Sequence, residues 1–231
     1  MKKATIATLA VFFLLIPLTL FLGTKLPGRS FYITGTLIVM EMLVPFFLSF
    51  EGRKPQAREL VLMAVLCALA IVSRSVVPIP HFKPIFAIVM ISGMAFGPQT
   101  GFMIGALSAF GSNFFVGQGP HTPWQMMAFG AAGLAAGLLF RKNRFTRNPL
   151  VLAAFGFLTC LFWIGPLLDC SHIFLMLSKI DAKTVFATFV AGFQVNIPQS
   201  ICTALAMLVF SRPLLEILDR IKRKYGMEGT P

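Results

Sequence analysis

Apolar runs alternate with short polar breaks along most of the chain. Eight runs predict helices that enter a membrane, at roughly residues 5–22, 31–50, 59–77, 84–97, 101–116, 123–140, 148–168 and 184–210. A bilayer core of about 30 Å needs about 20 apolar residues in a helix. The runs at 84–97 and 101–116 are shorter and meet at Gly97–Pro98–Gln99–Thr100, which predicts a tight hairpin or a bent pair.

Composition and charge agree with a membrane location. Hydrophobic residues make up 57% of the 231 residues, charged residues 12%, and the mean hydropathy is +0.82. These values predict an all-α integral membrane protein in a lipid bilayer. The net charge of +12 does not indicate nucleic acid, because the basic residues lie at membrane edges. With the N-terminus inside, the inner segments hold 14 of the 20 Lys and Arg residues and the outer segments 6, which predicts that both termini are cytoplasmic.

A charged break around residues 51–58 divides the chain. Before it, residues 1–52 hold two N-terminal spans, and after it residues 57–211 hold six. The first 22 residues look like a secretion signal, but no small-residue cleavage site follows, which favours a retained anchor. Residues 212–231 form a basic tail. Its alternating pattern fits an amphipathic helix on the inner leaflet or a partner, and equally a solvated end that only fixes topology.

The sequence contains no recognisable catalytic or metal motif. Cys67, Cys160 and Cys202 fall inside apolar runs and Cys170 near the outer edge, so neither a disulfide framework nor metal-ligand spacing is indicated. No Walker loop, zinc-ligand set or nucleophile elbow is present. We therefore expect a protein without a cofactor or a bound metal that is not an enzyme.

Small residues recur every four positions in two neighbouring runs. Gly101 and Gly105 lie in the first run, and Gly133 and Gly137 in the second. In hydrocarbon, small side chains that let backbones approach closely are what pack helices together. The loop between the runs, residues 117–125, is rich in Gly, Pro, Gln, His and Trp. At a membrane edge this composition is more typical of a binding surface than of a simple turn.

These features together resemble a known family. The segment Arg58–Ala70, Phe82–Lys83–Pro84 and the glycine-rich pair with its 117–125 loop are similar to the substrate-binding S components of energy-coupling factor (ECF) vitamin transporters. The resemblance covers residues 57–211. It implies a six-helix bundle with an outward-facing vitamin pocket, here preceded by two extra N-terminal transmembrane helices. The loop is most similar to the cobalamin-type branch, which implies cobalamin or a related corrinoid as the substrate.

The resemblance also implies partners and a transport mechanism. ECF S components work with a transmembrane coupling subunit and two cytoplasmic ATPases, and they tip in the membrane to deliver the loaded pocket inward. Ala64 and Ala68 match the Ala-xxx-Ala face that docks onto the coupling subunit. Small side chains at this spacing suit close helix packing.

Polar residues near the outer helix ends are the candidate binding residues. Such side chains are costly inside a bundle unless they pair, so each is a site candidate. The candidates are Arg74, His81, Lys83, Asn113, Gln118, Trp124, Gln125, Asn196 and Gln199. Amide groups suit the amides of a large vitamin, an indole suits stacking, and a positive cluster suits a phosphate or carboxylate.

Each candidate group also has a structural interpretation. Trp124 at a membrane edge is often an interfacial anchor, and Arg74 and Lys83 at such an edge often snorkel to the headgroups. The amides around Pro198 equally suit hydrogen bonds between helices. His81 or His121 is chemically able to bind cobalt, but a lone loop His is seldom a ligand. Glu41, in the second span, predicts a bond to a neighbouring helix, a protonated carboxyl or a proton relay.

Other functions remain open at this stage. S components for riboflavin, folate, thiamine, biotin or a queuosine precursor share the architecture. A stand-alone secondary transporter normally shows inverted repeats, and we see none that is convincing. An intramembrane enzyme needs ionisable residues that converge in the bundle, whereas Glu41, Arg74 and Asp169 lie far apart in the chain.

Overall fold

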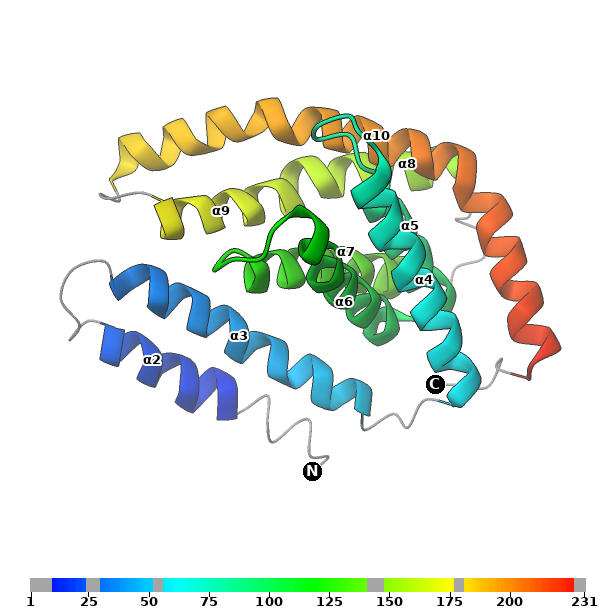
Figure 1. Cartoon of the computed structure of the whole chain (residues 1–231), viewed down its shortest axis with the longest axis horizontal. Coiled ribbons are helices and arrows are strands. Elements are labelled where there is room, and N and C mark those ends of the chain that lie inside the picture. Colours follow the sequence, from blue (N-terminus) through cyan, green and yellow to red (C-terminus); the bar gives the residue numbers. More distant parts are fainter. Residues whose placement is uncertain (1–9, 24–29, 52–55, 141–147, 177–180, 227–231) are drawn as a thin grey trace.

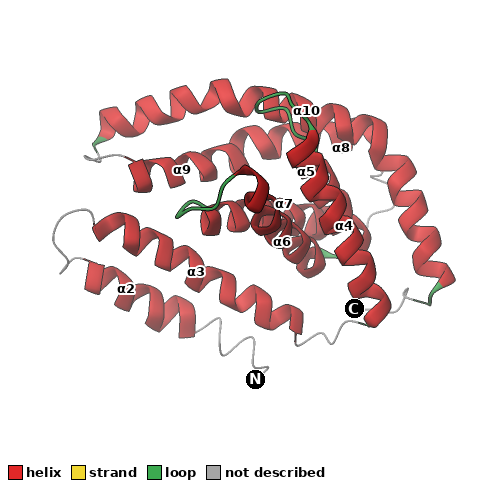
Figure 2. Ribbon diagram, in the orientation of Figure 1, coloured by secondary structure: helices red, strands yellow, loops and turns green. Residues whose placement is uncertain are grey.

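The described part of the chain consists of helices joined by turns and loops. The computed structural model describes residues 10–23, 30–51, 56–140, 148–176 and 181–226, and within the range 56–140 short turns and loops connect the helices (Figures 1 and 2). In chain order these are η1 (Val11–Leu15), α2 (Ile16–Gly23), α3 (Ser30–Glu51), α4 (Ala57–Val76), α5 (Ile85–Phe96), α6 (Pro98–Val116), α7 (Thr122–Phe140), α8 (Pro149–Thr159), η3 (Cys160–Ile164), α9 (Gly165–Met176) and α10 (Ala182–Lys224). The predicted all-α architecture is confirmed.

The protein is a multi-pass membrane protein. Among the described residues, five segments are long and apolar enough to cross a bilayer: Ile33–Glu51, Ala57–Val76, Thr122–Phe140, Pro149–Leu175 and Ala182–Lys224. The predicted first span, residues 5–22, is described only from residue 10, as η1 and α2, and is not among the five. Two complete N-terminal crossings are therefore not supported by the described residues.

The short helix α5 lies at the centre of the bundle. Eleven of its twelve residues are buried, and it contacts α4, α6, α7, α8 and α10. A helix that is apolar on every side is stable only when other elements surround it. Because protein rather than lipid covers α5, it does not need the length of a full crossing.

The glycines of α6 and α7 bring these two helices into backbone contact. A Cβ atom built on Gly133 would lie 2.2 Å from the carbonyl oxygen of Gly101, and one on Gly105 would lie 2.3 Å from that of Phe129. No side chain fits at either position. The close pairing predicted from the four-residue spacing is thus present in the structure.

The turn between α5 and α6 is as tight as the sequence predicted. Gly97 alone separates the two helices, with a φ of 102° that favours glycine. Its N–H donates to the carbonyl oxygen of Gly93. Pro98 opens α6, a position where its missing N–H costs nothing.

The last two predicted runs extend beyond their expected ends. The seventh continues through η3 and α9 to Met176. The eighth forms α10, which passes Pro198 and Pro213 without a break and ends at Lys224. Figure 1 shows α10 changing direction between its orange and red parts. The predicted core, residues 57–211, and the predicted tail, residues 212–231, therefore share one helix.

Hydrogen bonds join the N-terminal helices to each other and to the core. Within the leading pair, the hydroxyl of Thr19 on α2 donates to the carboxyl of Glu41 on α3 at 2.5 Å. Pairing with a neighbouring helix was one of the alternatives predicted for Glu41. At the C-terminal end of α3, the Gln99 amide of α6 donates to the Ser49 hydroxyl at 2.8 Å.

Replacing Gly133 with Ala tests the backbone contact. We expect the free energy of unfolding to fall by about 1–3 kcal/mol, because the new methyl group pushes α6 away from α7. The measurement is the thermal unfolding midpoint in detergent. Gly156→Ala is the matched control, because its Cβ would meet only side-chain atoms, the nearest at 3.2 Å. Equal losses in both variants would contradict the role given to this contact.

Candidate functional site

A cavity of about 450 Å³ lies among the ends of α4, α5, α6, α7 and the middle of α10. Its polar lining includes Arg74, Ser75, His81, Lys83, Gln125, Asn196 and Gln199. Its apolar lining consists of Ile85, Phe86, Val116, Phe129, Leu168 and Val195. Cavities of roughly 300–1,000 Å³ that combine an apolar wall with a few convergent polar groups are typical ligand sites.

Arg74 organises the polar side of this cavity. It lies in the last turn of α4, and its Nη1 donates to the Ser112 hydroxyl at 2.6 Å and to the Asn113 amide oxygen at 2.8 Å. Nη2 donates to the amide oxygen of Gln125 at 3.2 Å. The guanidinium also lies 5.1 Å from the centre of the Phe129 ring. These acceptors are neutral, so the cation keeps its charge and two further N–H donors for a ligand.

Gln199 ties the 77–84 loop to α10. Its amide oxygen accepts from the backbone N–H of Lys83 at 3.2 Å, and its amide nitrogen donates to the carbonyl oxygen of Lys83 at 2.6 Å. The Lys83 ammonium group donates to the carbonyl oxygen of Val77. His81, in the same loop, has a φ of 55°. This loop therefore forms a fixed wall of the cavity.

Asn196 connects the cavity to α9. Its side chain is 8% exposed, and its amide nitrogen donates to the Asp169 carboxylate at 3.0 Å. Gly165 permits the close approach, because a Cβ there would lie 2.4 Å from the Asn196 side chain. The polar residues of α10 thus serve both interpretations of the sequence: they line the cavity and they join helices.

The loop before α7 is held by its own hydrogen bonds. The Thr122 hydroxyl donates to the Gln118 amide oxygen at 2.9 Å, and it accepts from the Asn113 amide at 3.0 Å. The Gln118 amide nitrogen donates to the carbonyl oxygen of Phe110 at 3.1 Å. Gly117, with a φ of 124°, starts the turn. This loop is therefore ordered by contacts to the ends of α6 and α7.

Six of the nine predicted binding residues line the cavity, and three do not. Asn113 is fully buried and contacts Arg74, while Gln118 is exposed and holds the loop. Trp124 is 7% exposed and stacks on Phe174 of α9, with ring centres 5.4 Å apart. Trp124 is neither at the cavity nor at an exposed membrane edge, because its side chain points toward α3 and α9.

Sequence reasoning missed the aromatic wall. Phe86 and Phe129 meet edge to face, with ring centres 4.6 Å apart, and both line the cavity. The chain has 25 phenylalanines, so composition did not single these out. One signal was present: Phe129 follows Gln125 by four residues and so shares its helix face.

Comparison with known proteins identifies the family. The family model for ECF-type riboflavin transporter S components matches residues 54–216. The chain belongs to this family. Comparisons with curated proteins and with solved structures give no significant match.

Membership in this family decides the general role of the protein and the classes of its substrate and partners. The S component is a subunit of a transporter and not an enzyme, and it implies a vitamin substrate and the ECF module as partners. The predicted cobalamin-type branch is not supported, because the matching model is of the riboflavin type. In the loop that suggested cobalamin, Gln118 and Thr122 bond to residues of α6, and Gln125 lines the cavity. Within the described residues, no group of three His, Cys, Asp or Glu is placed to hold a metal ion.

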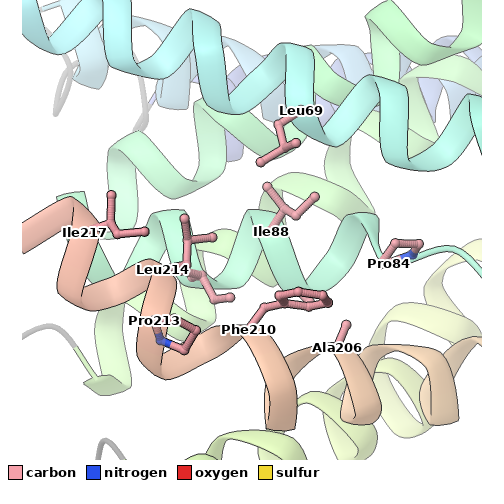
Figure 3. A pocket seen from close by; sticks show the side chains of 10 residues that line it. Leu69, Pro84, Ile88, Ala206, Phe210, Pro213, Leu214 and Ile217 are labelled. Carbon is pink, nitrogen blue, oxygen red and sulfur yellow. The ribbon is translucent and has the colours of Figure 1, made fainter.

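In this S component, Ala64 and Ala68 lie on an exposed face of α4. Their neighbours Val61, Val65 and Val72 are 63%, 58% and 53% exposed. Beside this face, an apolar cavity of about 360 Å³ lies between α4, α5 and α10 (Figure 3). Figure 3 shows Leu69 and Ile88 in the upper part of the view, with Phe210 and Leu214 below them.

Replacing Arg74 with Lys tests its organising role. A single ammonium group cannot reproduce the planar guanidinium that reaches three acceptors, so at least one buried acceptor loses its partner. We expect a loss of about 1–3 kcal/mol in the free energy of unfolding, measured by thermal unfolding in detergent. Arg212→Lys is the control, since that side chain is 74% exposed. An unchanged midpoint in the Arg74 variant would contradict this role.

Proposed function

We propose that this S component captures riboflavin, or a vitamin of similar size and ring chemistry, in the outer cavity. The observation that carries the proposal is the pairing of an aromatic wall, Phe86 and Phe129, with convergent polar groups from Arg74 and Gln125. A flavin is a flat three-ring system with carbonyl and nitrogen acceptors at one end. It matches such a cavity by stacking on one side and by hydrogen bonding on the other.

The size of the cavity favours a flavin over a corrinoid. A volume of about 450 Å³ suits a ligand of a few rings. A corrin with its nucleotide loop is several times larger than a flavin. Riboflavin is also the vitamin named by the matching family model. Both observations favour a riboflavin-type substrate, which was among the alternatives that the sequence left open.

The orientation we propose places the cavity outside and both termini in the cytoplasm. The excess of Lys and Arg in the segments assigned to the inside supports this topology. We also propose that the segment of η1 and α2 completes an N-terminal hairpin with α3. The Thr19 to Glu41 hydrogen bond supports such a pair, because a carboxyl group in the membrane needs a partner.

Delivery of the vitamin is proposed to use the exposed face of α4. The coupling subunit would dock at Ala64 and Ala68, and two cytoplasmic ATPases would drive tipping of the loaded S component. The small side chains, and the apolar cavity between α4, α5 and α10, support close contact with a partner helix. The N-terminal domain, before the division at residues 51–58, does not cover this face, because its helix α3 packs on α6, α7 and α9.

Riboflavin binding tests the substrate assignment directly. Purified protein is expected to quench the fluorescence of added riboflavin with saturation, and to show no binding of cobalamin. Gln199→Leu is expected to weaken riboflavin binding on the order of tenfold, because the Lys83 backbone loses its tie to α10. Gln194→Leu is the matched control, since Gln194 is exposed on the same helix. Binding of cobalamin, or a failure to bind any flavin, would overturn the assignment.

Bulky substitutions on α4 test the docking face. Ala64→Trp and Ala68→Trp are expected to leave riboflavin affinity unchanged and to reduce uptake in cells by at least about tenfold, because they hold the partner helix away. Copurification of the coupling subunit with tagged protein measures docking. Normal uptake by both variants would place the docking surface elsewhere.

A further inference from the structure

Helix α3 lies outside the segment matched by the family model, yet it packs tightly on the core. It contacts α6, α7 and α9, and Figure 1 shows it running alongside them. Phe46 stacks on the fully buried Phe102 of α6, with ring centres 3.9 Å apart and planes 12° apart. The bond from Gln99 to Ser49 fixes its inner end. The inner half of α3 is therefore anchored to α6.

The outer half of α3 presses on a pair of aromatic rings. A Cβ atom on Gly35 would lie 3.3 Å from Trp124 of α7 and 3.4 Å from Phe174 of α9. The two rings stack against each other at 5.4 Å, with planes 21° apart. A β-methyl group on residue 35 would already press on both rings, and a larger side chain would displace them. Trp124 Nε1 has no hydrogen-bond partner among the described residues, so packing alone holds this ring.

Trp124 does not line the cavity but lies next to a residue that does. It lies in the first turn of α7, next to Gln125, whose amide oxygen accepts from Arg74 at 3.2 Å. Two residues earlier, Thr122 holds Asn113 and Gln118. The Trp124 ring is therefore packed in the same turn of α7 as Gln125, which lines the polar side of the cavity.

We propose that α3 is a brace that positions the vitamin cavity: Gly35 seats the α3 backbone against the Trp124–Phe174 pair and so fixes the start of α7 relative to α9. The proposal rests on the proposed function for its effect on affinity, whereas the effect on α7 stands without it. Trp124 is thus a positioning residue and not a residue that touches the vitamin. This brace gives the N-terminal helix α3 a role in vitamin binding rather than in docking to the coupling subunit.

Two variants of α3 separate the brace from general stability. Gly35→Leu adds bulk against the two rings. Leu37→Phe adds bulk on the opposite face, where Leu37 is 46% exposed. Both are made in a Trp163→Phe background, so that Trp124 is the only tryptophan left. Hydrogen exchange of residues 117–129, Trp124 emission and the riboflavin dissociation constant are measured for the full chain in detergent.

Gly35→Leu is expected to speed hydrogen exchange in residues 117–129, shift Trp124 emission and weaken riboflavin binding on the order of tenfold. Leu37→Phe is expected to resemble the background protein. Adding Phe174→Ala to Gly35→Leu makes room for the new side chain and is expected to restore most of the affinity. Phe174→Ala alone completes the double-mutant cycle.

Three results would overturn the brace. One is normal exchange and normal affinity in Gly35→Leu despite shifted Trp124 emission. Another is faster exchange spread evenly over all helices, which indicates a loss of stability only. The third is equal effects of Gly35→Leu and Leu37→Phe. If the Trp163→Phe background protein itself binds no riboflavin, the proposed substrate is wrong. Hydrogen exchange of residues 117–129 in Gly35→Leu then still decides for or against the brace.

Discussion

The backbone contact between α6 and α7 is the constraint on which the rest of the structure depends. A carbonyl oxygen of one helix lies where a side chain of the other would stand, at Gly101 and Gly133. In a membrane, where water does not drive helices together, contact at this distance is what supplies dispersion attraction between them. It also fixes the C-terminal end of α6 and the N-terminal end of α7, from which Asn113 and Gln125 reach Arg74.

The half-buried guanidinium of Arg74 depends on this packing. A charge at this depth is tolerated because Ser112, Asn113 and Gln125 supply acceptors from two helices whose spacing is already set. The acceptors are neutral, so the positive charge is not cancelled and remains available to an electron-rich ligand. The aromatic ring of Phe129 closes the other side. In the proposed function, binding and stability depend on the same hydrogen bonds.

The proposed binding cavity and the proposed docking face are separated on the bundle. The cavity lies at one end of α4, at Arg74, while Ala64 and Ala68 are exposed along the length of this helix. The N-terminal helix α3 packs on α6, α7 and α9, away from this face. Helix α3 thus leaves the exposed face of α4 uncovered. This arrangement is physically consistent with a subunit that must bind cargo and dock at once.

The sequence by itself determined the membrane class, the helical architecture and the close glycine pair, because these follow from local properties: run length, apolarity and residue spacing. It also marked Arg74, Gln125 and Gln199, since a polar residue in an apolar run is conspicuous. Tertiary structure alone decided that Trp124 packs away from the cavity and that Phe129 lines it. Aromatic residues are common in this chain, and only the contacts between distant helices separate those that form a wall from those that form the core.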